Sequence, residues 1–199
     1  IGMSCVTKFW LKKKYNSDKT HLFDWSISNL SFILYILENK FKMFNIEDFK
    51  EIDYFDNKHH TTQKYMFADY ISVHDVDIYG TNKNEFINKI NRRKMRLLDI
   101  LCNKNNKVNL IYTISQDICE TYKIESKLSK DMLHKIENLC NCDLNFTILC
   151  TNETHYFYYK KKYPEINIIN MNHYLNSSYI QKEGDDYWKL EIFDWMNVI

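Results

Sequence analysis

A cysteine near the start of the chain and a histidine after an expected strand are the residues best suited to catalysis. Cys5 follows Gly2, where the chain can turn from a strand into a helix. A thiol attacks as the thiolate, and a cysteine at a helix start has a lowered pKa because the amide dipoles favour the anion. His74 can then accept the proton while a third group orients its ring. The groups that can do so are Asp75, Asp24, Asp77 and Asn152.

Both residues also have a purely structural interpretation. A cysteine near an apolar helix is usually a small core residue, and a histidine after a strand is more often a hydrogen-bonded turn residue. The catalytic interpretation therefore depends on elements that bring Cys5 and His74 together.

Helical periodicity recurs along the chain. Apolar residues spaced by three and four predict helices over 5–13, 26–41, 84–102, 129–139 and 186–196. In the second of these, Phe41 belongs to the apolar face and Asp24, Ser26 or Ser28 can cap the start. The helix over 84–102 is the clearest amphipathic element, with Lys89, Arg92, Arg93 and Arg96 expected mostly outward.

Short apolar runs rich in β-branched residues separate these helices. They predict strands over 65–68, 70–73, 108–114, 146–150 and 166–169. Strands that alternate with helices indicate crossover units, and continuous apolar runs indicate strands covered on both faces. We therefore expect one α/β domain over 1–199, with three layers and a mostly parallel sheet of about five strands with helices on both faces.

Ligands in such sheets bind beyond the carboxyl ends of the strands. Cys5 and His74 both fall on this expected rim. We expect Cys5, His74 and Asp75 to be catalytic. The residues expected to bind substrate are Gly2, Asp24, Trp25, Ser115 and Asn152.

Composition excludes several classes of protein. The 199 residues carry a formal net charge of +1, which argues against a dedicated nucleic-acid binder. With only three glycines, no glycine-rich phosphate loop can form. No apolar run approaches the roughly eighteen residues of a membrane span, so we expect a soluble, cytoplasmic protein with no membrane partner. Only three of the 27 basic residues are arginine, which indicates an AT-rich viral or bacterial genome, so lysine-rich stretches carry little weight.

Two further clusters have structural interpretations that we prefer. Cys140 and Cys142 lack the two-residue gap of a zinc knuckle, and His134 adds only a distant third ligand. We expect no metal and no cofactor, with these cysteines ending a helix and entering a strand. The aromatic run 156–159, followed by three lysines, suggests a half-buried surface helix or loop rather than a stacking site for nucleic acid.

Three segments together resemble a known family. They are Ile1-Gly2-x-x-Cys5, Leu22-Phe23-Asp24-Trp25, and Val73-His74-Asp75 followed by a basic amphipathic helix and an apolar strand. In order and rough spacing they resemble the family described as papain-like cysteine peptidases (domain of unknown function 1796). The resemblance covers most of the chain and implies roles for Gly2, Cys5, His74 and Asp75 in the site.

The chain departs from this family at two positions and in its expected fold. Leu22 replaces the usual proline, and Ser115 or Gln116 stands where relatives often have an arginine. The resemblance also implies that residues before Ile1 are missing. A papain-like fold would pack a helix on an antiparallel sheet, and we prefer the parallel arrangement.

These observations lead to one main expectation and two alternatives. We expect a thiol-dependent hydrolase acting on a peptide or small-molecule substrate through a Cys5 and His74 dyad. The alternatives are a Rossmann-like glycosyltransferase or nucleotide-sugar-binding protein, in which Cys5 is structural, and a non-catalytic interaction domain. The oligomeric state stays open.

Overall fold

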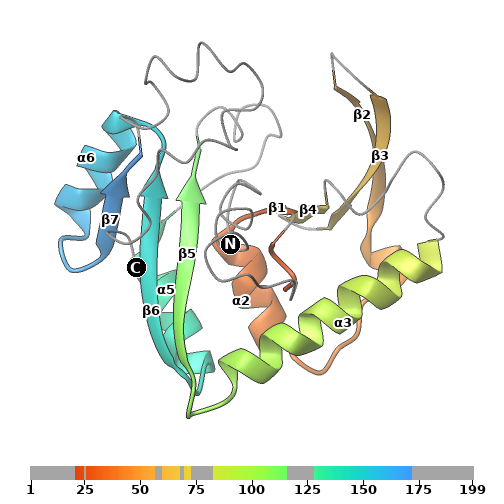
Figure 1. Ribbon diagram of the computed structural model, residues 1–199, viewed down its shortest axis with the longest axis horizontal. Helices are drawn as coiled ribbons and strands as arrows, with labels where there is room; N and C mark the ends of the chain where they lie inside the picture. The colour runs from red at the N-terminus through yellow and green to blue at the C-terminus, as the bar shows by residue number, and fades with distance from the viewer. Residues whose placement is uncertain are drawn as a thin grey trace, which may run out of the picture.

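The computed structural model describes residues 21–24, 26–56, 60–67, 70–72, 83–115 and 128–171 (Figure 1). These residues form a mixed α/β arrangement with one parallel sheet, one antiparallel sheet and several helices. The α/β class expected from the sequence is therefore confirmed. No helix in these ranges is both long and apolar enough to cross a bilayer.

The parallel sheet has the strand order β5-β6-β7. Its strands are β5 (Lys107–Ile114), β6 (Asp143–Cys150) and β7 (Asn167–Asn170). Helix α5 (Lys130–Leu139) precedes β6, and α6 (Glu153–Lys162) connects β6 to β7. Because such crossovers are right-handed and the strand order advances in one direction, α5 and α6 lie on the same face of the sheet.

Both faces of the parallel sheet are buried near its carboxyl end. On the first face, Leu110, Tyr112 and Ile148 join the main core cluster together with Leu133 and Ile136 of α5. On the opposite face, Ile111 is 5% exposed and Leu149 is 2% exposed, although neither belongs to that cluster. This two-sided burial accounts for the continuous apolar runs in the sequence.

The second sheet is antiparallel and has the order β1-β4-β3-β2. Its strands are β1 (Ser26–Ser28), β2 (Lys50–Asp56), β3 (His60–Phe67) and β4 (Tyr70–Ser72). In the view of Figure 1 it lies beyond β5, on the side away from β6.

The strand predicted over 70–73 exists, but it does not belong to the parallel sheet. Only residues 68 and 69 separate β3 from β4. A parallel connection needs a crossover of a dozen or more residues, whereas two residues suffice for a hairpin, so these strands pair antiparallel. The strands predicted over 108–114, 146–150 and 166–169 do form the parallel sheet.

The helix predicted over 26–41 is shorter than expected. Residues Ser26–Ser28 form β1 and pair with β4, and α2 covers only Leu30–Glu38.

The N-cap of α2 is Asn29, whose side-chain oxygen accepts a hydrogen bond from the Phe32 N–H at 3.2 Å. The expected caps Asp24, Ser26 and Ser28 were wrong because the serines lie in the strand and Asp24 in the preceding turn. Phe41 lies beyond the helix and is 83% exposed rather than part of an apolar face.

Helix α3 (Lys83–Leu101) matches the predicted amphipathic helix, but two of its basic residues are buried. Arg93, expected outward, is 6% exposed, and Lys94 is fully buried. The helix predicted over 129–139 corresponds to α5. The aromatic run 156–159, expected to be a half-buried surface helix or loop, lies in helix α6, which has no fully buried residue. Those predicted over 5–13 and 186–196 lie outside the described residues.

The loop after α2 is fixed to α3 by two buried polar side chains. Asn91 makes a pair of hydrogen bonds with Phe44, accepting from its N–H at 2.8 Å and donating to its carbonyl at 2.9 Å. The Lys94 ammonium donates to the carbonyls of Asn39 and Lys42 and lies 4.8 Å from the centre of the Phe44 ring. Burial lowers the pKa of Lys94, partly opposed by the charge of Asp48. A cation at Asn39, the C-cap of α2, also complements that helix dipole.

Replacing Asn91 with alanine should therefore destabilise the fold. The Phe44 N–H and carbonyl would lose their partners while buried, which costs about 2 to 4 kcal/mol. Urea denaturation of N91A against the wild type measures this loss.

Asn88 provides a matched control because it lies on the same helix and is exposed. N88A gains the same helix propensity as N91A, so its free energy of unfolding should change by less than about 1 kcal/mol. Equal effects of the two variants would show that the Asn91 hydrogen bonds do not stabilise the loop.

Candidate functional site

The structure describes part of the site predicted from the sequence. Asp24, Ser115 and Asn152 lie within the described residues. The other predicted site residues, Gly2, Cys5, Trp25, His74 and Asp75, lie outside them. The described geometry therefore concerns the elements next to these residues.

The pairing of β1 with β4 links two of the sequence motifs. Ser26 pairs with Ser72 in an antiparallel register. Asp24 comes two residues before Ser26, and His74 comes two residues after Ser72. Because the strands run in opposite directions, the chain enters β1 at the same end of the pair at which it leaves β4. The segment 22–24 and the strand β4, which leads toward His74, are thus neighbours in space, although they are distant in sequence.

Side chains reinforce this junction. The Tyr70 hydroxyl of β4 donates a hydrogen bond to the Leu22 carbonyl at 3.3 Å. The Phe23 ring meets the Tyr70 ring edge-on, with 6.4 Å between the ring centres. Leu22, Phe23 and Tyr70 are all buried, so apolar burial holds the backbone that leads into Asp24 in place.

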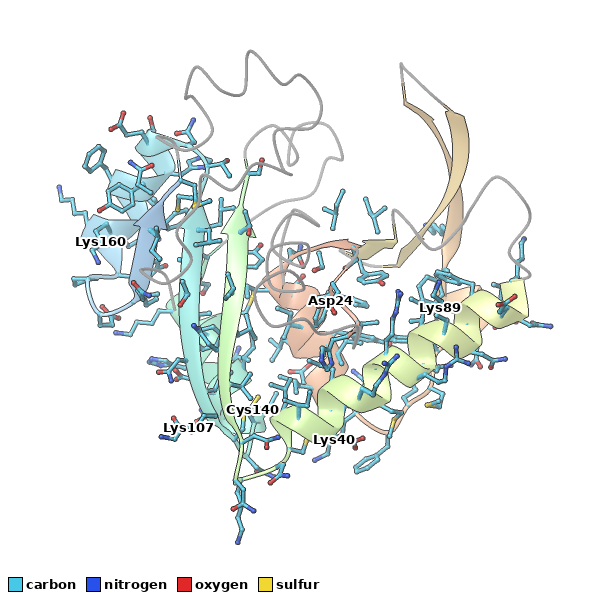
Figure 2. The ribbon with its side chains drawn as sticks, viewed as in Figure 1. Asp24, Lys40, Lys89, Lys107, Cys140 and Lys160 are labelled. Carbon is cyan, nitrogen blue, oxygen red and sulfur yellow. The ribbon has the colours of Figure 1, made fainter. Side chains whose placement is uncertain are left out.

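Asp24 itself is a half-buried carboxylate in the turn that precedes β1. Its Oδ2 accepts a hydrogen bond from the His21 N–H at 2.6 Å, and its own N–H donates to the His21 carbonyl at 3.3 Å. A hydrogen bond from a backbone N–H to a carboxylate is charge-assisted and strong, so this bond fixes the orientation of the group. Figure 2 shows Asp24 beside α2, close to the start of β1.

Ser115 and Asn152 lie together at the carboxyl end of the parallel sheet, as predicted. Ser115 is a buried residue directly after β5. The neighbouring Thr151 donates hydrogen bonds to the Ile114 carbonyl from its N–H, at 3.1 Å, and from its hydroxyl, at 3.3 Å. The Asn152 side-chain oxygen accepts from the N–H groups of Thr154 and His155 and so caps α6. This cap gives Asn152 a structural role at the rim.

Two of the described cysteines are poor nucleophiles. Burial raises the pKa of the Cys150 thiol, which ends β6, to about 12. Burial and, to a smaller extent, the neighbouring Cys142 and Cys102 raise the pKa of Cys140 to about 12. Since the thiolate is the reactive form, the raised pKa values make both side chains poor nucleophiles near neutral pH.

Cys140 and Cys142 occupy the structural positions expected for them. Cys140 is the C-cap of α5, and Cys142 directly precedes β6. Figure 2 shows Cys140 beside Lys107, at the amino ends of the parallel strands. In the ranges that the structure describes, no three His, Cys, Asp or Glu residues are grouped as metal ligands.

A cavity of about 570 Å³ lies away from the predicted rim. It is formed by α5 and the amino-terminal parts of the parallel strands, including Asn145 and His134. In its lining, the Thr147 hydroxyl donates to Asn109 Oδ1 at 3.1 Å and accepts from the Asn167 amide at 3.3 Å. Lys130 and Glu165 form an ion pair of 2.8 Å at its edge. The sequence analysis missed this cavity, although its signal was the alternation of polar residues at 109, 145, 147 and 167 with apolar neighbours.

Comparisons with known proteins identify no relative of this chain. No family model matches the sequence, and searches against curated proteins and solved structures also find no significant match. The resemblance to papain-like cysteine peptidases therefore stays a prediction that depends on the three short segments.

Removing the Tyr70 hydroxyl should weaken the junction of β1 and β4 without changing its apolar packing. The Leu22 carbonyl would lose a buried partner in Y70F, which costs about 1 kcal/mol of unfolding free energy. Urea denaturation measures the effect, and Y156F, which changes a half-buried tyrosine of α6, is the matched control. If Y70F is as stable as Y156F, the hydroxyl does not anchor segment 22–24.

Proposed function

We propose that this protein is a thiol-dependent hydrolase in which Cys5 is the nucleophile and His74 is the general base. Asp24 or Asp75 orients the imidazole. The observation that carries the proposal is the β1 and β4 register, which joins the segment containing Asp24 to the strand that leads into His74. The buried cysteines Cys140 and Cys150 are unsuited to the same role because their thiols stay protonated near neutral pH.

The proposed reaction proceeds in two halves. The Cys5 thiol gives its proton to the neutral His74 ring, and the resulting thiolate attacks the carbonyl carbon of a peptide, amide or ester bond. The tetrahedral intermediate collapses to a thioester as the imidazolium gives its proton to the leaving amine or alcohol. His74 then takes a proton from water, hydroxide attacks the thioester, and the acid is released with the thiol restored.

Asp24 suits the orienting role because its position is fixed before any substrate arrives. A carboxylate held by a backbone N–H and preceded by two buried residues needs little reorganisation. Such a group stabilises an imidazolium by charge and fixes which ring nitrogen carries the proton.

We further propose that the three described parallel strands belong to a larger sheet of about five strands within a three-layer domain. The support is the burial of Ile111 and Leu149 on the face opposite α5 and α6. Buried apolar residues on this second face require a covering layer, which is typical of three-layer α/β proteins.

Thiol alkylation tests the proposed nucleophile. With iodoacetamide at pH 7, we expect Cys5 to react at least about tenfold faster than free cysteine, because its proton is transferred to His74. H74A should abolish this advantage, and D24N should reduce it. Peptide mass spectrometry after timed quenching measures the rate at each cysteine.

The chain contains its own internal controls. Cys140 and Cys150 have raised pKa values, so each binds more protons in the folded than in the unfolded state above about pH 9. Both should stay unmodified at pH 7 and begin to react only as the pH approaches 12 or the protein unfolds. C102S, which removes a half-buried cysteine, should leave the labelling of Cys5 unchanged.

Two results would contradict the hydrolase. The first is a Cys5 that reacts no faster than free cysteine, and the second is an H74A variant that reacts like the wild type. Thermal stabilisation by a nucleotide sugar, combined with an inert Cys5, would instead favour the glycosyltransferase or nucleotide-sugar-binding alternative. An inert Cys5 without any such ligand would favour the non-catalytic interaction domain.

A further inference from the structure

The loop after α2 exposes basic and apolar side chains in alternation. Lys40, Phe41, Lys42 and Met43 are consecutive, and all four are exposed. Phe41 is 83% exposed and Met43 46%, and the Lys40 ammonium lies 5.3 Å from the centre of the Phe41 ring. We call residues 40–43 the docking tip. Burial of an exposed aromatic ring against a partner surface is favourable, so this loop offers an apolar anchor between two cations.

Buried polar groups hold the docking tip in this conformation. Lys94 binds the carbonyls of Asn39 and Lys42, and Asn91 binds both backbone groups of Phe44. The backbone on either side of Phe41 is therefore fixed. Since the loop is ordered on folding, docking does not have to pay its conformational entropy again.

Helix α3 adds one exposed apolar side chain next to the docking tip. Met95 is 36% exposed and lies one turn beyond Asn91, which binds the backbone of Phe44. Phe41, Met43 and Met95 are three of the six large apolar side chains that are exposed among the described residues. Lysine is common throughout this chain, so the two lysines of the docking tip support an inference only together with the exposed ring between them.

We propose that the docking tip, together with Met95, binds the surface of an anionic phospholipid bilayer. The Phe41 ring and the Met43 side chain enter the headgroup region, and the ammonium groups of Lys40 and Lys42 meet lipid phosphates and carboxylates. This is a peripheral contact. It differs from the expectation of no membrane partner, which was based on the absence of an apolar run long enough to span a membrane.

Shape and charge favour a bilayer over a protein. An ordinary protein interface buries about 800 Å² on each side around several clustered anchors, whereas here one ring projects between two lysines. A small apolar tip flanked by cations suits the interface of a membrane, where aromatic rings lie at headgroup level and basic side chains reach the anionic surface. The nearest acidic side chains in sequence, Glu38 and Glu47, lie outside the tip.

Vesicle flotation tests this proposal with the full chain. The wild type should float with vesicles of phosphatidylserine and phosphatidylcholine, should not float with phosphatidylcholine alone, and should be released by added salt. F41S should lower the partition coefficient by about tenfold or more. The double variant K40Q/K42Q should lower it by a similar factor, since each lysine near the surface contributes about fivefold.

Phe157 supplies the matched control. It is 60% exposed on α6 and is followed by Lys160, Lys161 and Lys162, so F157S removes a similar ring beside similar charges elsewhere on the molecule. F157S should bind anionic vesicles like the wild type. Because both rings are exposed, F41S and F157S should keep the wild-type urea midpoint.

Three outcomes would overturn the proposal. It fails if the wild type does not float with anionic vesicles. It also fails if F41S binds as well as the wild type, or if F157S loses as much binding as F41S. If sedimentation shows self-association that F41S removes while vesicles do not bind, the surface joins two copies of the chain instead. The proposed hydrolase does not enter this test, so either idea can fail without the other.

Discussion

Burial of the Phe32 ring is the interaction on which the described structure depends most. Phe32 lies on α2, is 1% exposed, and stacks on Tyr70 of β4 with 4.7 Å between ring centres. It also meets the rings of Phe23 and Phe44, and Phe44 continues through Phe49 to Phe86 of α3. One aromatic cluster therefore joins α2, the antiparallel sheet, the segment containing Asp24 and the loop held by α3. Large rings suit this role because each buries much apolar area and offers contacts in several directions.

The two proposals use different ends of this cluster. Through Phe23 and Tyr70 it fixes the junction of β1 and β4, on which the proposed Cys5 and His74 chemistry depends. Through Phe44 it supports the loop that presents Phe41 to solvent. Both regions are rigid because an apolar contact is reinforced by hydrogen bonds to backbone groups, so neither backbone carries unsatisfied buried atoms at these positions.

Local patterns predicted much of the described fold. The helices α3 and α5 and the strands β5, β6 and β7 lie within a few residues of their predicted ranges because each combines a clear period with several apolar residues. The position of Ser115 at the same edge as the residues that follow β6 was also predicted, since parallel strands end at a common edge. The predicted start of α2 was wrong because the apolar spacing of residues 26–28 fits a helix and a short strand equally well. Pairing with strand β4 decides between the two.

The sequence by itself determined the α/β class, the positions of the strongly periodic elements and which residues could do chemistry. Tertiary structure alone decided that β4 pairs antiparallel with β1, that Lys94 is buried while Phe41 is exposed, and that a cavity opens beside α5. The physical reason is the distance along the chain over which each interaction acts. Periodicity and capping act within one or two turns of chain, whereas strand partners, burial of a charged side chain and the shape of a cavity depend on segments that are distant in sequence. Lys94 illustrates this most clearly, because the carbonyls that make its burial possible lie more than fifty residues before it.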